Sequence, residues 1–307
     1  MSSLSPIFIV GTGRCGTSML LKIINNFTSI AIPPESHFIP VFLKNLHKYE
    51  PLSNDENILR LLKDIKEFPY VRDWNKSFHF DIKKVAEQVK SRTFQGVLEA
   101  IYSEFARQKG KKRWGDKTPP YITCMSDLYS LFPTAKFLHI IRDGRDCALS
   151  VIRCNWGPKN IYKSALWWRE SLLKGQQELE YLRKVVPNIE KVYLEVKYED
   201  ILDNPGIELK RIFDFLQEPF DVEIIDKLKI RQDNKFKWKK RLSEREKQLF
   251  EQVAGDILRY YGYETNFEGL PRLSNFTKFY YSLDNRIKSL KNVYWDIKRA
   301  IYKTMQV

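Results

Sequence analysis

The sequence predicts an α/β fold in which helices flank a central parallel sheet. Two short apolar runs, Ile7–Val10 and Phe137–Ile141, each lead into a turn that is followed by a helical pattern. A continuous apolar run is typical of a strand that is covered on both faces, as the strands of parallel sheets are. At 307 residues and 43% hydrophobic content, the chain is long enough for one large α/β domain or two small ones.

The first run leads into a glycine-rich loop, Gly11-Thr-Gly-Arg-Cys-Gly-Thr-Ser18, and then into a helix. Glycines let the backbone approach a ligand, and the N–H groups of a helix N-terminus attract an anion. The spacing matches a P-loop, but Thr17 stands where a P-loop kinase has its lysine, and the cation comes earlier, at Arg14. The loop therefore suits a phosphate-like group. The alternative is a tight turn without a ligand.

A short second strand is expected at Ile30–Ile32, and Pro33-Pro34 stiffens the chain after it. Glu35 is thereby presented just past a strand end, where α/β folds place functional side chains. The alternative for Glu35 is a solvated loop acid, and His37 carries little weight alone.

Residues 38–110 have mostly helical patterns, for example at 55–68, 81–89 and 94–107, with a break at 73–75. We interpret this part as a helical insert near the site of the second substrate. An extended segment, 114–119, follows it and is stopped by prolines, with Lys117 near its end.

The second apolar run ends at Arg142, and Ser150 lies about two helical turns further along the chain. Arginine makes bidentate contacts with phosphate groups, so the two residues could grip one anion. The alternative is a charged turn with internal Arg–Asp pairs.

Further along, a strand ends at Tyr198, and Pro205 begins a helix that runs to Leu216. A basic loop at 234–242 interleaves cations with aromatic rings, a combination that can hold a nucleotide. Its candidate residues are Lys235, Trp238 and Lys239, and the alternative is a solvated linker. A helix is predicted at 156–182 and another at 243–261, the latter with Ser243 and Glu246 as a capping box and Gly262 at its end.

The C-terminal segment, 266–307, forms a basic amphipathic helix in this interpretation. Its apolar residues fall on one helical stripe: Leu283, Ile287, Leu290, Tyr294, Ile297, Ile301 and Met305. Such a helix could pack on its own domain, pair with a second copy or lie on a membrane. The pattern favours packing or pairing.

Composition narrows the classes of partner. The formal net charge of +14 predicts attraction to anionic ligands, such as nucleotides, acidic glycans, nucleic acid or a membrane surface. The four cysteines have neither CxxC spacing nor neighbouring histidines, so no metal site is predicted and a reducing compartment is expected. The polar N-terminus and the lack of a long apolar run favour a cytoplasmic protein.

The order of these motifs resembles the sulfotransferases that use 3′-phosphoadenosine 5′-phosphosulfate (PAPS). Gly11–Ser18 is similar to their 5′-phosphosulfate loop, and residues 137–150 are similar to their 3′-phosphate strand, loop and helix. The resemblance covers about residues 6–263, and it is closer to the protein-tyrosine, Golgi-type and bacterial branches than to the cytosolic small-molecule branch. It implies a sulfotransferase domain at 1–265 with a P-loop-like fold, and a separate extension at 266–307.

The resemblance also implies roles for individual residues. Glu35 matches the catalytic Glu of the tyrosine-sulfating branch, and Lys117 matches its catalytic Lys, with Arg14 as the loop cation. The donor-binding residues would be Gly13, Arg14, Cys15, Gly16, Thr17, Ser18, Arg142, Ser150, Tyr198, Lys235, Trp238 and Lys239. No metal is required, and the product would be 3′-phosphoadenosine 5′-phosphate (PAP).

The expected acceptor is a hydroxyl, with a saccharide or similar group favoured over a peptide tyrosine, and an acidic glycan or peptide suits the basic charge. Two other functions stay open at this point. One is an unusual P-loop kinase, and the other is a non-enzymatic basic module for glycan or nucleic acid, although no specific nucleic-acid partner is expected.

Overall fold

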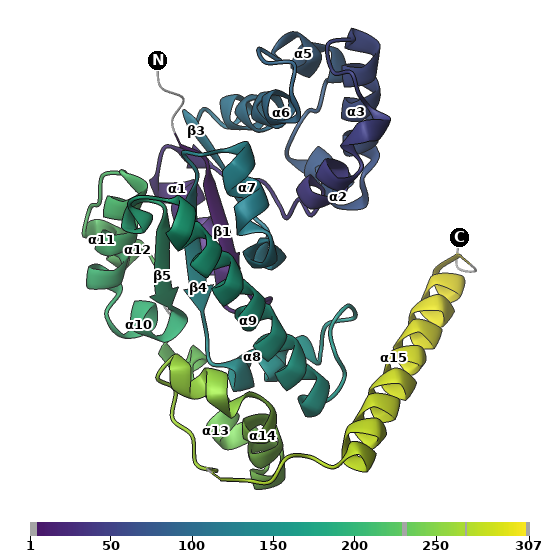
Figure 1. The fold of residues 1–307 in the computed structure, drawn as a ribbon, viewed down its shortest axis with the longest axis vertical. Coiled ribbons are helices and arrows are strands. Elements are labelled where there is room, and N and C mark those ends of the chain that lie inside the picture. Colours follow the sequence, from purple (N-terminus) through teal and green to yellow (C-terminus); the bar gives the residue numbers. More distant parts are fainter. Residues whose placement is uncertain (1–4, 229–231, 268, 305–307) are drawn as a thin grey trace. The chain divides into compact units, whose positions relative to one another are not determined.

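In the computed structural model, residues 5–228, 232–267 and 269–304 are described, and their side chains are described except at 75, 232 and 291–304. The elements surround a five-stranded parallel sheet with the strand order β2-β3-β1-β4-β5 (Figure 1). Helices flank this sheet, so the predicted α/β fold class is confirmed.

The two apolar runs form neighbouring central strands, β1 (Ile7–Gly11) and β4 (Lys136–Ile141). Every residue of both strands is buried, which explains the absence of polar alternation. The edge strands are β2 (Ile30–Ala31) and β5 (Tyr193–Lys197), and α10 (Tyr198–Asp203) follows β5 directly.

The polar segment before the prolines forms the remaining strand of the sheet, β3 (Arg113–Lys117). It pairs with β1 on one side and with β2 on the other. All five of its residues are buried despite two cations and an acid. Arg113 donates to Glu218 Oε1 over 2.6 Å, and a Cβ on Gly115 would lie 2.7 Å from the Ile7 carbonyl oxygen. Charge pairing and close approach therefore replace apolar patterning in this strand.

The predicted helical insert is present between β2 and β3 and consists mainly of helices. These are α2 (Ile39–Lys44), α3 (Asp55–Glu67), α4 (Pro69–Arg72), α5 (Ile82–Glu87) and α6 (Phe94–Gln108). The break at 73–75 is a 3-10 turn whose Trp74 is fully buried. The Tyr102 ring stacks on Trp114 of β3, with ring centroids 4.6 Å apart, and ties the insert to the sheet.

The remaining helices mostly agree with the predicted patterns. They are α1 (Thr17–Phe27), α7 (Met125–Leu131), α8 (Gly144–Val151), α9 (Ile161–Val185), α11 (Pro205–Leu216), α12 (Glu223–Lys227), α13 (Trp238–Arg241), α14 (Glu244–Tyr260) and α15 (Asn275–Thr304). Helix α9 begins five residues later than predicted. The capping box of Ser243 and Glu246 is confirmed, and Gly262 has the left-handed φ of 69° that ends a helix.

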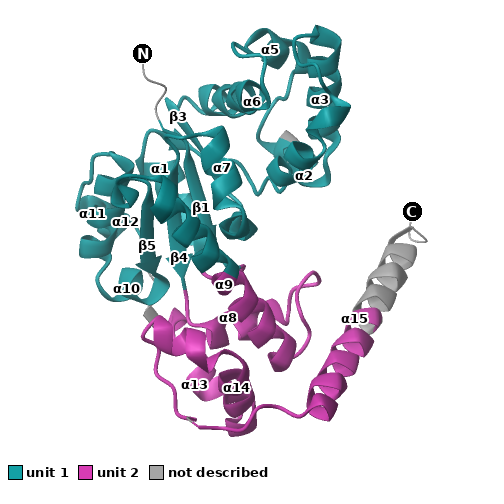
Figure 2. Cartoon of the chain, viewed as in Figure 1, with its two compact units in different colours: residues 1–12, 16–141, 174–230 teal, residues 13–15, 142–173, 231–307 magenta. Residues whose placement is uncertain are grey.

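Contacts divide the chain into two compact units, which are coloured in Figure 2. Unit 1 comprises residues 1–12, 16–141 and 174–230, and it contains the whole sheet and the insert. Unit 2 comprises residues 13–15, 142–173 and 231–307, and it contains α8, α13, α14 and α15. Among the described residues, no helix is long and apolar enough to cross a membrane.

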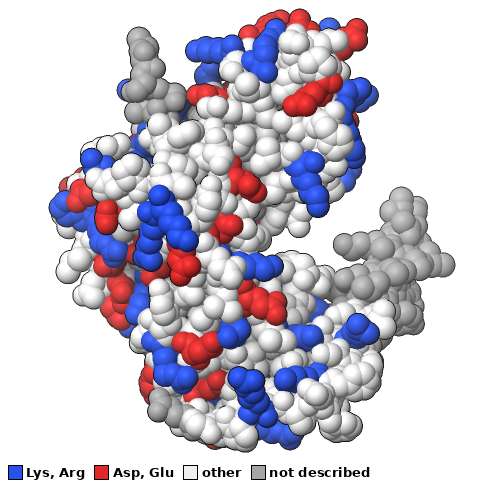
Figure 3. All heavy atoms as spheres, viewed as in Figure 1, with Lys and Arg blue, Asp and Glu red and all other residues white. Residues whose placement is uncertain are grey.

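Charged side chains are mixed on the face of the molecule drawn in Figure 3. Lys and Arg are spread over both units there and stand among Asp and Glu. On that face, therefore, the net charge of +14 does not mark out one binding surface.

Candidate active site

In unit 1, Gly16 is tightly packed at the start of α1. Gly16 precedes the helix with φ of 113°, and a Cβ there would lie 2.4 Å from Cδ2 of Tyr198. Only glycine fits this position, because the left-handed backbone and the ring both exclude a side chain. Thr17 is buried and Ser18 is exposed. The structure thus brings Tyr198 against the N-terminus of α1, a contact that the sequence did not predict.

In unit 2, the loop cation and helix α8 meet. The exposed Arg14 donates from Nε to Oγ of Ser150 over 2.8 Å. A Cβ on Gly13 would lie 2.8 Å from the Trp156 ring, so this glycine also permits a close approach. No pattern in the sequence predicts the contact between Arg14 and Ser150, which are 136 positions apart.

Arg142 stands at the end of β4 and is held by polar partners. Its Nη2 donates to Oδ2 of Asp146 over 3.2 Å and to the carbonyl oxygen of Asn234 over 2.5 Å. Burial raises the pKa of Asp146, and the charge of Arg142 partly opposes that rise. The internal Arg–Asp pairing that the turn permits is therefore present, and it fixes the guanidinium in place.

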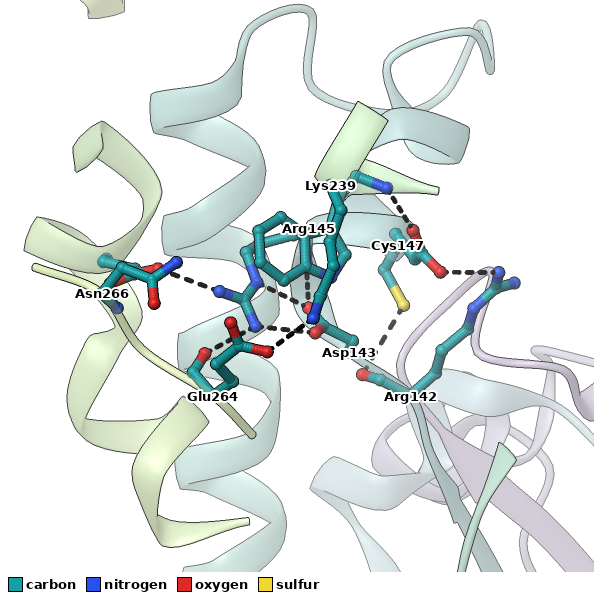
Figure 4. Close-up of polar contacts among 10 residues, drawn as sticks. Arg142, Asp143, Arg145, Cys147, Lys239, Glu264 and Asn266 are labelled. Atoms are coloured by element: carbon teal, nitrogen blue, oxygen red, sulfur yellow. Dashed lines mark hydrogen bonds and ion pairs between the residues drawn. The ribbon is translucent and has the colours of Figure 1, made fainter. Parts of the chain in front are cut away.

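A buried arginine, Arg145, holds the same turn through several hydrogen bonds (Figure 4). Arg145 is fully buried and donates to both carboxylate oxygens of Asp143, over 3.0 and 2.8 Å. It also donates to Oε1 of Glu251 over 2.9 Å and to the carbonyl oxygen of Glu264 over 2.8 Å. Such a network costs much free energy to break, because it would leave buried charges unpaired. The sequence interpretation missed Arg145.

The basic segment does not present its tryptophan to solvent. Trp238 is 1% exposed, and the Arg145 guanidinium lies 3.5 Å from its ring centroid. Its backbone N–H donates to Oδ1 of Asp146 over 2.9 Å. Because a side chain already covers the ring, a base-stacking role for Trp238 has no support from its placement. Lys239 is exposed and donates to Glu264 Oε2 over 2.6 Å, and Lys235 is half-buried.

Glu35 and Lys117 meet in unit 1. Lys117 donates from Nζ to Oε1 of Glu35 over 2.6 Å, and Nε2 of His37 lies 2.9 Å from Oε2 of the same carboxylate. Burial raises the pKa of Glu35, but the His37 hydrogen bond and the charge and hydrogen bond of Lys117 outweigh it and lower the pKa overall. Glu35 is therefore ionised at neutral pH, with each oxygen held by one partner.

The segment around Glu35 is fixed by buried hydroxyl groups. The Ser36 N–H donates to Oγ1 of Thr118 over 3.0 Å, and Ser36 Oγ lies 2.7 Å from the hydroxyl of Tyr121. These bonds link the residue after Glu35 to the residues after Lys117. Burial raises the pKa of Tyr121 well above its usual value, so its hydroxyl stays protonated. Sequence reasoning missed this positioning network, since isolated hydroxyl residues carry no pattern.

Both Glu35 and Lys117 line a cavity of about 570 Å³ in unit 1. Its other walls come from α1, from the segment before Glu35 and from the insert: Leu21, Asn25, Ile32, Pro34, Ser77, Phe105 and Lys109. The volume is in the range of small-molecule sites. A cavity with an ionised carboxylate beside an ammonium group can take a proton from a bound hydroxyl and stabilise negative charge next to it.

Metal ligands do not gather in the part of the chain that the structure describes. No group of three or more His, Cys, Asp and Glu side chains there could hold a metal ion. The four cysteines form no disulfide bond with one another, and Cys15 and Cys147 are buried.

Comparison with known proteins relates this chain to one family. A model of the sulfotransferase family matches residues 6–222. Protein-tyrosine sulfotransferase A of Caenorhabditis elegans is 23% identical over 220 residues, which are 71% of this chain and 51% of that protein. An uncharacterized protein of Aquifex aeolicus is 22% identical over 225 residues, which are 72% of this chain and 26% of that one. The chain thus spans about half and about a quarter of these two relatives.

Two solved structures share the fold. The sulfotransferase domain from the curacin biosynthetic pathway has a TM-score of 0.55 at 19% identity, over 85% of this chain and 99% of that domain. The sulfotransferase domain of the Synechococcus PCC 7002 olefin synthase has a TM-score of 0.50 at 21% identity, over 87% of this chain and 98% of that domain. Because the family match covers well over half of its length, the chain belongs to the sulfotransferase family.

Proposed function

We propose that the chain transfers the sulfuryl group of PAPS to an acceptor hydroxyl and releases PAP. The observation that carries the proposal is the Glu35–Lys117 pair, 2.6 Å apart on the wall of the 570 Å³ cavity. The acceptor oxygen attacks sulfur, the bond between sulfur and the bridging phosphate oxygen breaks, and the acceptor proton passes to Glu35. Sulfuryl transfer, like phosphoryl transfer, asks the protein mainly for positioning and charge stabilisation.

Glu35 is the proposed general base. His37 and Lys117 lower its pKa against the effect of burial, so the group is ionised at neutral pH, which is the form that can accept a proton. Each oxygen uses one partner, and a carboxylate has further lone pairs that an acceptor hydroxyl can reach. A positioned base of this kind contributes ~10²–10⁴-fold to the rate.

Lys117 and Arg14 are the cations that we propose stabilise the leaving group. Both would stabilise the charge that grows on the bridging phosphate oxygen as the bond to sulfur breaks. Lys117 is buried, and a fixed ammonium in a low-dielectric wall interacts more strongly with that charge than a solvated one.

The donor would be recognised at both of its ends. Gly13, Cys15, Gly16, Thr17 and Ser18 would hold the 5′-phosphosulfate through backbone N–H groups and hydroxyls. Arg142 and Ser150 would hold the 3′-phosphate, the group that distinguishes PAPS from ATP. The contact between Arg14 and Ser150 supports a shared ligand for the loop and for α8. Tyr198, Lys235 and Lys239 are further donor contacts in this proposal.

The residues of the cavity walls support two candidate classes of acceptor. Asn25 and Ser77 are polar residues of these walls, which supports a saccharide or similar hydroxyl. A peptide tyrosine is the second candidate. The apolar side chains of Leu21 and Ile32 and the cation of Lys109 would suit a tyrosine in an acidic peptide. The named activity of the worm relative also supports it.

The test is transfer of radiolabelled sulfate from PAPS to a panel of saccharides and tyrosine peptides, with Glu35→Gln as the inactive comparison. We expect labelled product with the wild-type protein and none with Glu35→Gln. Mg²⁺-dependent ATP turnover that PAP does not inhibit would instead indicate a kinase. Binding of acidic polymers that falls steeply with salt and ignores PAP would indicate a non-enzymatic basic module.

A further inference from the structure

The described part of helix α15 is attached to the rest of unit 2 by hydrogen bonds on its polar side. Asn285 Oδ1 accepts from the Lys159 N–H over 2.7 Å, and Asp284 Oδ2 accepts from Asn160 Nδ2 over 2.8 Å. The Tyr281 carbonyl oxygen also accepts from Asn160 Nδ2, over 2.7 Å. Lys159 and Asn160 are both nearly buried, so these bonds fix the helix by residues 281–285.

The apolar side of α15 is left uncovered. We call six residues on it the apolar stripe, and all of them are large hydrophobics with 46–79% of their surface exposed: Phe276, Phe279, Tyr280, Leu283, Ile287 and Leu290. With 3.6 residues per turn, their spacing places them within an arc of about 100°. A helix in a globular protein normally buries such a stripe, whereas in α15 the stripe is exposed and the contacts with the rest of unit 2 include Asp284 and Asn285.

The charge of α15 identifies the kind of surface that fits the stripe. By sequence the helix carries seven cations (Lys278, Arg286, Lys288, Lys291, Lys298, Arg299 and Lys303) and two acids (Asp284 and Asp296), a net charge of +5. A second copy of the helix would bring an equal positive charge against it. An anionic surface would be attracted instead, by about 1 kcal/mol for each cation that reaches it.

We propose that α15 docks this protein onto an anionic lipid bilayer, with the apolar stripe buried among the lipid headgroups. Exposed Phe and Leu on one side of a basic helix are the composition that such interfacial helices have. The predicted continuation of the stripe at Tyr294, Ile297, Ile301 and Met305 lies outside the described side chains and is not needed for the proposal. The inference goes beyond the proposed function and does not depend on it.

The sequence pattern favoured packing or pairing for this helix, and the described residues give the reason to prefer a bilayer. Packing on the rest of unit 2 does occur, through the hydrogen bonds at residues 281–285 and the stacking of Tyr281 on Tyr162, but it leaves the stripe exposed. Pairing stays as a competing outcome, and the experiment below separates it from docking.

The experiment is co-sedimentation of the full chain with vesicles of phosphatidylcholine alone or mixed with phosphatidylserine. The double variant Phe279→Ser/Leu290→Ser removes two exposed members of the stripe. The matched control, Ile207→Ser/Val222→Ser, removes two residues that are 69% and 66% exposed elsewhere. Circular dichroism and thermal unfolding establish that all the proteins are folded.

Wild-type protein and the control are expected to bind the mixed vesicles, with affinity that falls as salt is raised and that is much weaker without phosphatidylserine. The stripe variant is expected to lose affinity by on the order of 100-fold, since two buried apolar side chains are removed. The proposal is overturned if wild-type protein ignores both vesicles, or if the stripe and control variants bind equally well. A dimer in sedimentation velocity that the stripe variant abolishes, without vesicle binding, would replace docking by self-association.

Discussion

Lys117 Nζ lies 2.6 Å from Glu35 Oε1, although 82 positions separate the two residues in the chain. Strand pairing explains the contact. Strands β2 and β3 are parallel neighbours, with Ile30 opposite Arg113, so both segments leave the sheet at the same edge. Glu35 follows β2 and Lys117 ends β3, and the Ser36–Thr118 bond holds the two segments together. The sheet thus fixes the base and the cation independently of the loop after β1.

Replacing the carboxylate tests the base directly. Glu35→Gln keeps the shape of the side chain but cannot accept the acceptor proton, so we expect kcat to fall by ~10²–10⁴-fold. PAP affinity should stay within a few-fold of wild type, because Glu35 is not a proposed donor contact. The measurement pairs steady-state transfer rates with PAP calorimetry. A variant with wild-type kcat would remove Glu35 from the mechanism.

The pH dependence of transfer tests the environment of Glu35. Because His37 and Lys117 lower its pKa, the base stays ionised as the pH falls through the usual glutamate range near 4.3. We expect kcat/KM of wild-type protein to show no acidic limb above that range. Lys117→Met removes one of the groups that lower the pKa of Glu35, while burial still raises that pKa. The acidic limb should therefore move to higher pH.

Lys117→Arg is the matched control for that shift, because it keeps a cation beside the carboxylate. It should leave the acidic limb close to that of wild type even if kcat falls. An acidic limb that does not move in Lys117→Met, or that moves to lower pH, would contradict the assigned electrostatics. The position of the limb can be measured even when the variant is slow.

The sequence predicted the central strands well and the polar strand less well. Ile7–Val10 and Phe137–Ile141 are apolar runs, and local composition suffices to identify them. Strand β3 has no such pattern, because Arg113 is neutralised by Glu218, a residue 105 positions away. Its pairing depends on long-range contacts that no local window contains. Only an extended segment with Lys117 near its end was predictable.

The buried Arg145, which holds the turn after Arg142, is expected to dominate local stability. Arg145→Met would leave Asp143 and Glu251 buried without their cation, and we expect a loss of about 3–5 kcal/mol in the free energy of unfolding. The control is Arg169→Met, which breaks the partly exposed pair with Asp256 in the same unit and should cost at most about 1 kcal/mol. Urea unfolding measures both. Equal losses would contradict the structural role of Arg145.

Trp238 shows why site residues were harder to predict than strands. A tryptophan among lysines is compatible with a base-stacking platform, yet its ring is buried beneath Arg145. Neither Arg145 nor its partners Glu251 and Glu264 lie near Trp238 in sequence. The sequence pattern therefore showed that this segment combines lysines with a tryptophan, but it did not show that the tryptophan is buried. The burial of Trp238 depends on contacts across more than 90 positions, such as its bond to Asp146.

Gly16 is expected to tolerate no side chain. Gly16→Ala would combine a left-handed φ of 113° with a Cβ 2.4 Å from the Tyr198 ring. Gly110→Ala is the control, since its φ of 66° is also left-handed but open space surrounds it, and it should cost about 1–2 kcal/mol. We expect Gly16→Ala to be less stable than Gly110→Ala in urea unfolding. Equal stability of the two variants would show that the Tyr198 ring can move aside without a loss of folding free energy.

Discrimination between PAP and adenosine 5′-monophosphate tests the central claim most directly, because the two nucleotides differ only in the 3′-phosphate and no acceptor is needed. The variants are Arg142→Gln and Ser150→Ala, each checked for folding by thermal unfolding. Charge-assisted bonds to that phosphate contribute about 1.5–3 kcal/mol. By calorimetry, wild-type protein should therefore bind PAP at least about tenfold more tightly than the monophosphate, and both variants should lose most of that preference. Equal wild-type affinity for the two nucleotides would contradict PAPS as the donor.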